Sequence, residues 1–181
     1  MEIAMETADD ETLHERWIDL SPALGPVRLL ATNEALVAVY FEDHRRPRHG
    51  EARVRDAGSR HRVLDQAARE LTEYARGTRS AFTLPLAPIG TDFQRAVWDA
   101  LARIPLGETR SYEELAHAIG RPRAVRAVGS ANAQNPLSIV VPCHRVVGKS
   151  GGLTGYAGGM ARKEWLLTHE RRWQTDRTML T

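Results

Sequence analysis

The sequence of 181 residues contains a single cysteine, Cys143. One cysteine cannot form an intramolecular disulfide, and it cannot supply a zinc ribbon or finger built on several cysteines. No run approaches the roughly 18 consecutive apolar residues that a membrane-spanning helix needs. The acidic start, MEIAMETADDETLHE, lacks the basic residues and apolar run of a signal peptide. We therefore expect a cytoplasmic protein with no membrane partner, no metal and no other cofactor.

Aromatic residues are scarce, at 6%, while hydrophobic residues make up 42% and charged residues 27%, as in ordinary globular proteins. The net charge of +2 is unevenly distributed. Residues 1–89 carry 12 basic and 15 acidic side chains, whereas residues 90–181 carry 13 and 8. A mildly basic half suits a polyanionic partner, because Arg and Lys neutralise phosphates and release counterions. A surplus of this size is also common on a solvated surface, so charge alone leaves nucleic-acid binding open.

The first half has the pattern of a small α/β unit. Two apolar runs, 27–32 and 35–41, flank a polar pair and predict a β-hairpin. The charged segment 42–62, interrupted by Pro and Gly, is typical of a surface loop. Apolar positions between 63 and 75 then follow a helical stripe, which we expect to end at Gly77.

The second half contains two sequence signals for helix starts. Thr91 with Gln94, and Ser111 with Glu114, fit capping boxes that each precede an amphipathic helix. Gly120 is placed to end the second of these helices, and a helix rich in small residues, RAVRAVGSANAQN, follows. Helix, glycine-containing turn and small-residue helix form the outline of a helix-turn-helix. That outline alone is weak evidence, because many small helical pairs share it.

Four further segments complete the interpretation. They are FTLPL (82–86) as a returning strand, NPLSIVVP as a short buried strand, GKSGGLTGYAGG as a glycine-rich loop, and MARKEWLLTHE as a last helix. We therefore predict an α+β protein. A small N-terminal α/β unit with a β-hairpin or sheet (1–88) precedes a mostly helical C-terminal domain with the helix-turn-helix (89–172). A polar tail follows (173–181).

Candidate chemistry concentrates at Cys143. A lone cysteine is usually a buried, inert side chain, but here Pro142, His144 and Arg145 surround it. A nucleophilic sulfur needs its proton removed, and an imidazole oriented by a carboxylate can do this. His144 is the neighbouring imidazole, and Glu170, at the end of the last helix, is the candidate carboxylate. We expect such a partner to lower the pKa of Cys143.

Four collinear motifs then carry a family resemblance. They are SYEELA, RAVGSANAQNP, PCHRV and GYAGG-x-x-RKEWLL-x-HE. They resemble the O6-alkylguanine-DNA alkyltransferase family, in particular its bacterial stand-alone members, and the match runs from about Thr91 to Glu170. Residues before Thr91 fit the family only loosely.

The resemblance implies the catalytic roles. Cys143 attacks the alkyl carbon on guanine O6 in a direct displacement, His144 removes the thiol proton through a water, and Glu170 holds the imidazole. Tyr112 donates to guanine N3, so that the base leaves without a full negative charge. Asn135 braces the turn between the recognition helix and the active-site strand.

The resemblance also implies how the lesion is reached. The partner is double-stranded DNA with alkylated bases, approached from the minor groove, and the damaged nucleotide rotates out of the stack. Arg126 fills the space that the base vacates, and the small residues of its helix allow a close approach. The implied DNA-binding residues are Arg126, Ala127, Gly129, Ser111 and Arg123.

A loop and a pocket wall complete the implied site. Tyr156, Ala157, Gly158 and Gly159 resemble a loop that closes over the flipped base. The implied substrate-binding residues are Val146, Tyr156, Ala157, Gly158 and Ser138. Asn132 and Ser138 are polar where some relatives have apolar residues or proline, which leaves the width of the alkyl pocket open.

Two other functions stay open from the residues alone. A helix-turn-helix regulator would explain the basic half without any chemistry. A cysteine hydrolase would explain Cys143 and His144, but not Arg126 on a helix of small residues. The resemblance implies a monomer of which each molecule repairs one lesion, on O6-alkylguanine and also on O4-alkylthymine.

Overall fold

The structure is a computed structural model that describes residues 13–44, 54–56 and 60–178. The chain divides into two compact units, residues 1–89 and 90–181. Both units combine helices with short strands, so the predicted α+β class is confirmed. None of the helices in the described ranges is long and apolar enough to cross a membrane.

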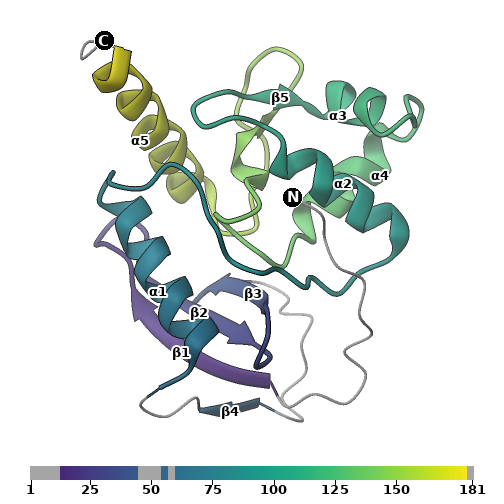
Figure 1. The fold of residues 1–181 in the computed structure, drawn as a ribbon. Helices are drawn as coiled ribbons and strands as arrows, with labels where there is room; N and C mark the ends of the chain where they lie inside the picture. Colours follow the sequence, from purple (N-terminus) through teal and green to yellow (C-terminus); the bar gives the residue numbers. More distant parts are fainter. Residues whose placement is uncertain (1–12, 45–53, 57–59, 179–181) are drawn as a thin grey trace. The chain divides into compact units, whose positions relative to one another are not determined.

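The first unit is a four-stranded sheet with one helix packed on it (Figure 1). The elements are β1 (Leu13–Asp19), β2 (Pro26–Ala31), β3 (Leu36–Phe41), β4 (Val54–Asp56) and α1 (Arg62–Ala75). The strand order is β3-β2-β1-β4, with β2 antiparallel to both β1 and β3, and β4 parallel to β1. The predicted hairpin is the β2–β3 pair and is confirmed.

The core of this unit lies where α1 meets the sheet. All six residues of β3 are buried, as are Val63, Leu64 and Leu71 on one face of α1. These helical positions belong to the apolar stripe predicted from the sequence, and the turn after the helix has Gly77 with a φ of 73°. Each fully buried aliphatic side chain contributes about 1.5–3 kcal/mol to stability.

Two strands of this sheet were not predicted. β1 mixes charged and apolar residues without a regular alternation, and it forms a strand because its residues 14–19 pair with β2. β4 lies within segment 42–62, so the expected surface loop is wrong at residues 54–56. Residues 45–53 and 57–59 of that segment lie outside the described residues.

The returning strand expected at residues 82–86 is also wrong. Only Leu86 makes a β-bridge, to Leu36 in β3. Leu36 donates its N–H to the carbonyl of Pro85, and the backbone N–H of Ala87 donates to the carbonyl of Leu36. Pro85 has no N–H to donate, which limits how far a ladder can extend here.

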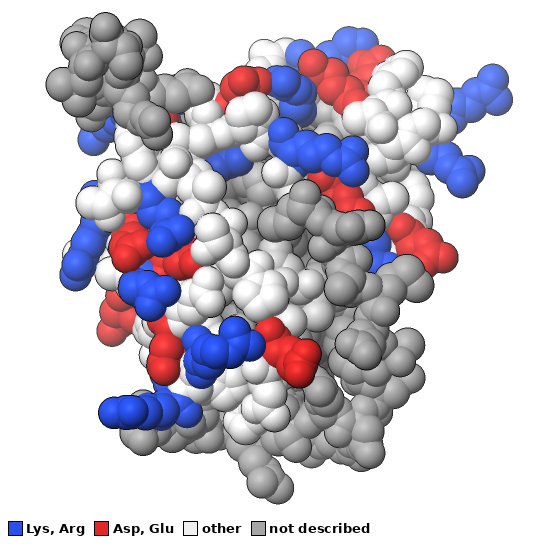
Figure 2. Space-filling model, in the orientation of Figure 1, with Lys and Arg blue, Asp and Glu red and all other residues white. Residues whose placement is uncertain are grey.

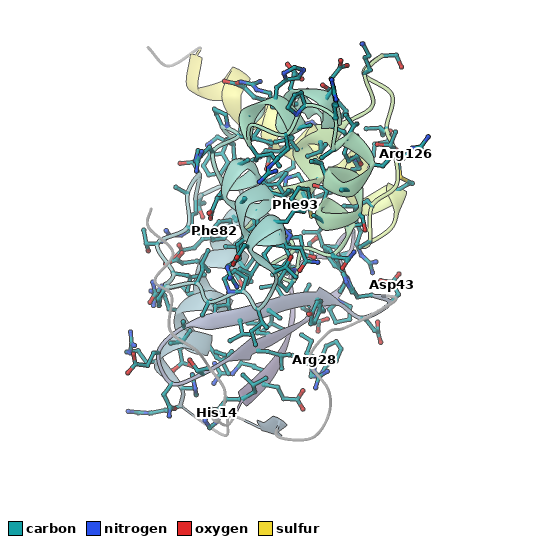
Figure 3. All side chains as sticks on the ribbon, turned by 90° about the vertical axis from the view of Figure 1, so that its right-hand side faces the viewer. His14, Arg28, Asp43, Phe82, Phe93 and Arg126 are labelled. Carbon is teal, nitrogen blue, oxygen red and sulfur yellow. The ribbon has the colours of Figure 1, made fainter. Side chains whose placement is uncertain are left out.

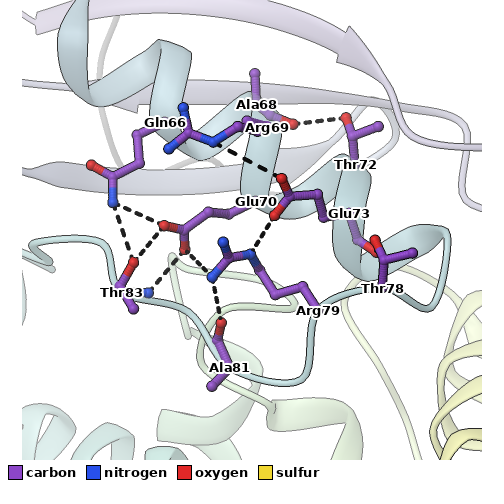
Figure 4. Close-up of polar contacts among 10 residues, drawn as sticks. All are labelled: Gln66, Ala68, Arg69, Glu70, Thr72, Glu73, Thr78, Arg79, Ala81 and Thr83. Atoms are coloured by element: carbon purple, nitrogen blue, oxygen red, sulfur yellow. Dashed lines mark hydrogen bonds and ion pairs between the residues drawn. The ribbon is translucent and has the colours of Figure 1, made fainter.

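A buried carboxylate fixes this segment instead. Glu70 of α1 is 1% exposed, and its carboxylate accepts from the hydroxyl of Thr83 at 2.6 Å and from its backbone N–H at 2.9 Å. Gln66 donates at 2.8 Å, and Arg79 lies 3.7 Å away (Figure 4). The side chain of Glu70 thus holds the extended segment after α1 in place of a regular sheet ladder.

The second unit is mostly helical (Figure 1). Its elements are α2 (Asp92–Ala102), β5 (Arg110–Ser111), α3 (Tyr112–Ala118), α4 (Val125–Ala133), a 3-10 helix (Cys143–Arg145), β6 (Val146–Val147) and α5 (Met160–Thr178). β5 and β6 pair in parallel, so the start of α3 lies beside the chain that leaves the 3-10 helix.

The predicted helix starts are confirmed. Both capping boxes are present, Thr91 with Gln94 at α2 and Ser111 with Glu114 at α3. Each satisfies two backbone N–H groups that a helix start leaves unpaired. α3 ends before Gly120, which has a φ of 69°, and α4 follows in contact with it, so the two helices form a helix–turn–helix pair.

Trp98 ties α2 to α4. Its side chain is fully buried, and its indole N–H donates to the carbonyl of Ala131 at 2.9 Å. A Cβ on Gly90 would lie 2.4 Å from the indole ring, so only glycine fits there.

The buried strand expected at residues 135–142 is wrong. The segment is buried, but it runs in turns, and Ile139 has a φ of 71°. Asn135 explains this geometry, because its side-chain oxygen accepts from the N–H of Leu137 at 3.0 Å and its amide donates to the carbonyl of Val141 at 2.8 Å. These polar groups therefore pair with a side chain and not with another strand.

The polar tail expected at 173–181 is helical for most of its length. α5 continues to Thr178, and residues 179–181 lie outside the described residues.

Candidate active site and nucleic-acid interface

Cys143 begins the 3-10 helix and is 4% exposed. Burial raises the pKa of its thiol, and a hydrogen bond with Asn135 and the charge of Lys163 offset this only in part. The expected lowering of the pKa of Cys143 is therefore wrong for the protein without DNA. Since the thiolate is the nucleophile, this sulfur needs a base.

His144 and Glu170 meet inside the second unit, as the sequence analysis expected. Both side chains are fully buried, and His144 Nε2 lies 2.8 Å from Glu170 Oε1. Burial lowers the pKa of His144, and the interactions with Glu170 offset this only in part, so the ring is neutral at pH 7.

Glu170 is held ionised by its partners. Burial alone would raise the pKa of Glu170, but the hydrogen bonds and charges of His144 and Arg145 hold it far below its usual range. Arg145 donates to both carboxylate oxygens, from Nε at 2.8 Å and from Nη2 at 2.9 Å, and the N–H of Gly107 donates at 3.2 Å. Because a carboxylate only accepts hydrogen bonds, His144 Nε2 carries the ring proton.

The other nitrogen of His144 is buried without a hydrogen-bond partner among the described residues. With the proton on Nε2, Nδ1 has a lone pair that can accept a proton. The site thus places a neutral imidazole, oriented by an ionised carboxylate, next in sequence to a buried thiol.

Arg145 and Lys163 are two buried charged side chains beside the candidate site whose contacts the sequence did not indicate. Arg145 was noted only as a neighbour of Cys143, yet it holds Glu170 with two parallel hydrogen bonds. Lys163 is fully buried, and its ammonium donates to the carbonyls of Val146 and Thr154. The position of Lys163 in the last helix gave no signal of this burial.

Tyr112 lies at the first position of α3, at the edge of the helix–turn–helix. A Cβ on Gly129 of α4 would be 3.7 Å from the tyrosine ring, so the ring packs against this glycine. The hydroxyl of Tyr112 accepts a hydrogen bond from Thr154 at 3.2 Å. Three segments of the second unit therefore position the phenol.

The loop residues differ in exposure. Gly158 is buried, while Tyr156 and Ala157 are half-buried. The Tyr156 ring meets His144 edge-on, with 6.4 Å between ring centroids. Burial and the nearby Cys143 raise the pKa of Tyr156 well above its usual value, so it stays a neutral phenol. These contacts bring the loop to the imidazole.

Two further implied pocket residues, Val146 and Ser138, are buried. The backbone carbonyl of Val146 accepts from Lys163, and Ser138 forms a hydrogen bond that lowers the pKa of Tyr156 in part. Asn132, the other polar departure from the family pattern, is buried as well.

The implied DNA-binding residues mostly face solvent. Arg123, Arg126 and Ala127 are exposed, and Figure 3 shows Arg126 at the periphery of the second unit. Gly129 and Ser111 are half-exposed, and the Ser111 hydroxyl is engaged in the cap of α3. On the face drawn in Figure 2, the basic and acidic side chains of the described residues are interspersed.

Comparison with known proteins places this geometry among relatives. The profile of the 6-O-methylguanine DNA methyltransferase DNA-binding domain matches residues 92–172. A methylated-DNA–protein-cysteine methyltransferase from Methanosarcina acetivorans is 45% identical over 81% of this chain and 92% of that protein. One from Methanosarcina barkeri is 58% identical over 58% of this chain, and the match spans 66% of the length of that protein.

Two solved structures from Mycobacterium tuberculosis are similar over most of the chain. An O6-methylguanine methyltransferase superposes with a TM-score of 0.79 at 42% identity, covering 94% of this chain and 100% of that one. The OGT protein in complex with DNA superposes with a TM-score of 0.78 at 43% identity, covering 88% and 94%.

Proposed function

This chain belongs to the methylated-DNA–protein-cysteine methyltransferase family, and on that premise we propose that it repairs DNA by transferring an alkyl group from O6-alkylguanine to Cys143. The observation that carries the proposal is the arrangement around His144. Its Nε2 is fixed by Glu170, and its Nδ1 has no partner among the described residues. That is the state of a base ready to accept a proton.

The first step is the activation of the sulfur. Burial keeps Cys143 protonated, so His144 Nδ1 takes the proton through a water as the sulfur attacks. The ionised carboxylate of Glu170 stabilises the imidazolium that results, and Arg145 keeps that carboxylate in place. General-base catalysis of this kind contributes about 10²–10⁴ to a rate.

The second step is the departure of the base. The S–C bond forms as the C–O6 bond breaks, and the purine takes up the electron pair. Tyr112 donates its proton to N3, so the guanine leaves neutral. Asn135 braces the turn that presents the sulfur. The product is a thioether, which water does not cleave, and each molecule therefore repairs one lesion.

Access to the lesion requires the base to leave the duplex stack, at a cost of a few kcal/mol. Arg126 is exposed on α4 and fills the vacated space, while Ala127 and Gly129 let the helix approach the minor groove. Arg123 and Ser111 contact the DNA backbone.

The flipped base is enclosed by the loop. Tyr156, Ala157, Gly158 and Gly159 close over it, and Val146 and Ser138 form the pocket wall. O4-alkylthymine presents the same alkyl–oxygen bond and is a second substrate. The protein acts as a monomer in the cytoplasm.

The test is the fate of the sulfur. Protein mixed with a duplex that contains O6-methylguanine should gain one methyl group on Cys143 by intact mass and peptide mapping, with no more than one equivalent of lesion repaired. Cys143→Ser should lose the transfer and keep DNA binding. Sustained turnover would indicate a hydrolase, and binding without an adduct would indicate a non-catalytic regulator.

Arg126→Ala tests the flipping step in the same assay. It should slow repair of the duplex far more than reaction with free O6-methylguanine, because the free base needs no flipping. Equal losses on both substrates would make Arg126 a structural residue.

A further inference from the structure

Thr154 contacts three separate parts of the second unit from within the glycine-rich loop. Its hydroxyl donates to the Tyr112 oxygen at 3.2 Å, and its carbonyl accepts from Lys163 Nζ at 2.8 Å. Its methyl group packs over Gly148, where a Cβ would lie 3.3 Å from Thr154 Cγ2. The position of this side chain is thus set by backbone, methyl and hydroxyl together.

The anchor for Thr154 is the buried ammonium of Lys163. Besides Thr154 it binds the carbonyl of Val146, at 2.5 Å, in the strand that follows the nucleophile. A buried charge is costly unless it is hydrogen-bonded, so the ammonium favours the conformation in which both carbonyls are engaged. Lys163 therefore ties the loop to the chain that carries Cys143.

In the glycine-rich loop, the side chain of Thr154 contacts the hydroxyl of Tyr112. The tyrosine ring is held by Gly129 of α4, and Thr154 supplies a hydrogen bond to its oxygen. An oxygen that accepts one hydrogen bond becomes a better donor in its own O–H bond, because chained hydrogen bonds polarise one another.

We propose that Thr154 is a positioning residue for the alkyl transfer, which orients the Tyr112 hydroxyl toward N3 of the target base. The inference rests on the proposed function. As the S–C bond forms and the C–O6 bond breaks, the proton of Tyr112 passes to N3. The Tyr112 oxygen then holds a negative charge until a proton returns from water. The hydroxyl of Thr154 stabilises that charge by continuing to donate to it.

Thr154→Val tests this role, because it removes the hydroxyl and keeps a branched side chain over Gly148. The maximal single-turnover rate on a duplex with O6-methylguanine should fall about fivefold to tenfold, which is the effect of one lost hydrogen bond. The DNA concentration for half-maximal rate should stay the same. Thr154→Ser keeps the hydroxyl and should recover most of the lost rate.

A modified substrate separates positioning from loop packing. In a duplex whose O6-methylguanine has carbon in place of N3, Tyr112 has no atom to protonate, so Thr154→Val should cost nothing further. In a protein that already carries Tyr112→Phe, Thr154→Val should likewise cause no further loss of the single-turnover rate. Equal slowing on both substrates, or additive losses with Tyr112→Phe, would overturn the role of Thr154. Absence of any cysteine adduct in the unmodified protein would instead refute the alkyl transfer itself.

Discussion

Glu70 in the first unit and Glu170 in the second are both almost completely buried, and each accepts several hydrogen bonds. For both, burial alone would raise the pKa, and for both the partners reverse the shift. The difference lies in what the partners are. The carboxylate of Glu70 binds the hydroxyl of Thr83, the amide of Gln66 and the guanidinium of Arg79 (Figure 4). Glu170 binds an imidazole.

Burial of a carboxylate and a full set of hydrogen bonds to its oxygens therefore do not by themselves mark it as catalytic. The groups that donate hydrogen bonds to Glu70 connect it only to neighbouring parts of the first unit. Glu70 therefore contributes to the stability of the fold. Around Glu170 one partner, His144, has a second nitrogen with no partner among the described residues. A buried carboxylate can take part in proton transfer when the imidazole that it orients has a second nitrogen able to accept a proton.

The largest expected effect is on the transfer rate. Glu170→Gln should slow reaction with free O6-alkylguanine at pH 7 by about 100-fold or more, and His144→Ala should slow it further, because the thiol loses its base. Glu70→Gln, the matched variant in the first unit, should leave the rate of the folded protein unchanged.

The pH profile sharpens this result. Burial raises the pKa of Cys143, so without the base the rate depends on unaided ionisation of the thiol. Between pH 6 and pH 9 the rates of the Glu170 and His144 variants should therefore climb more steeply than that of the unmodified protein. A Glu170→Gln profile parallel to the unmodified one would show that Glu170, like Glu70, only supports the fold.

The two arginines provide the next largest contrast. Arg145 is 8% exposed and donates twice to Glu170, so Arg145→Met leaves a buried charge unpaired and should lower the free energy of unfolding by about 3–5 kcal/mol. The side chain of Arg79 is 24% exposed, and Arg79→Met should cost about 1 kcal/mol or less. Urea denaturation measures both. Similar losses would mean that the two carboxylates depend equally on their arginines.

Features determined locally were predicted well from the sequence. The capping boxes at Thr91 and Ser111 depend on residues three apart, and the helical stripe of α1 on apolar spacing within 14 residues. β1 was missed because its charged and apolar residues become a strand only through pairing with β2. The run at 135–142 was taken for a strand because its apolar residues outweighed Asn135, whose side chain takes the backbone hydrogen bonds.

In the candidate site, too, the features set by local sequence were predicted and those set by tertiary packing were not. Cys143 and His144 are adjacent in the sequence, and the motif pattern pointed to Glu170, which the structure brings to 2.8 Å from His144. The parts played by Arg145 and Lys163 were not predictable, since both follow from burial of a charged side chain. Only tertiary packing decides which Arg or Lys is buried, and most are exposed.

A smaller effect is expected for the structural carboxylate itself. Glu70→Gln weakens three hydrogen bonds that hold the segment around Thr83, and it should lower the free energy of unfolding by about 2 kcal/mol at pH 7. Glu73→Gln is the matched control, because that side chain is 35% exposed and pairs with the same Arg79, in the segment after α1. Its cost should stay below about 1 kcal/mol. Equal costs would remove the distinction between a buried and a surface carboxylate in this unit.

The smallest effect is the change of the Glu70 contribution with pH, and its sign follows from the shifted pKa. The pKa of Glu70 is lower in the folded protein than in the unfolded chain, where a glutamate has a pKa of about 4.3. The stabilisation is therefore fully present above about pH 5 and is lost as the pH falls through the folded value. Urea midpoints of the unmodified protein and Glu70→Gln should differ by a constant amount from pH 7 to about pH 5.5. They should converge only as the pH falls through the lowered pKa of folded Glu70, because below it both proteins carry an uncharged side chain. The gap for Glu73→Gln should stay small throughout. A Glu70 gap that widens toward acid would mean that burial dominates and that Glu70 folds as a neutral acid, in which case the two buried glutamates would differ in charge as well as in the partners they hold.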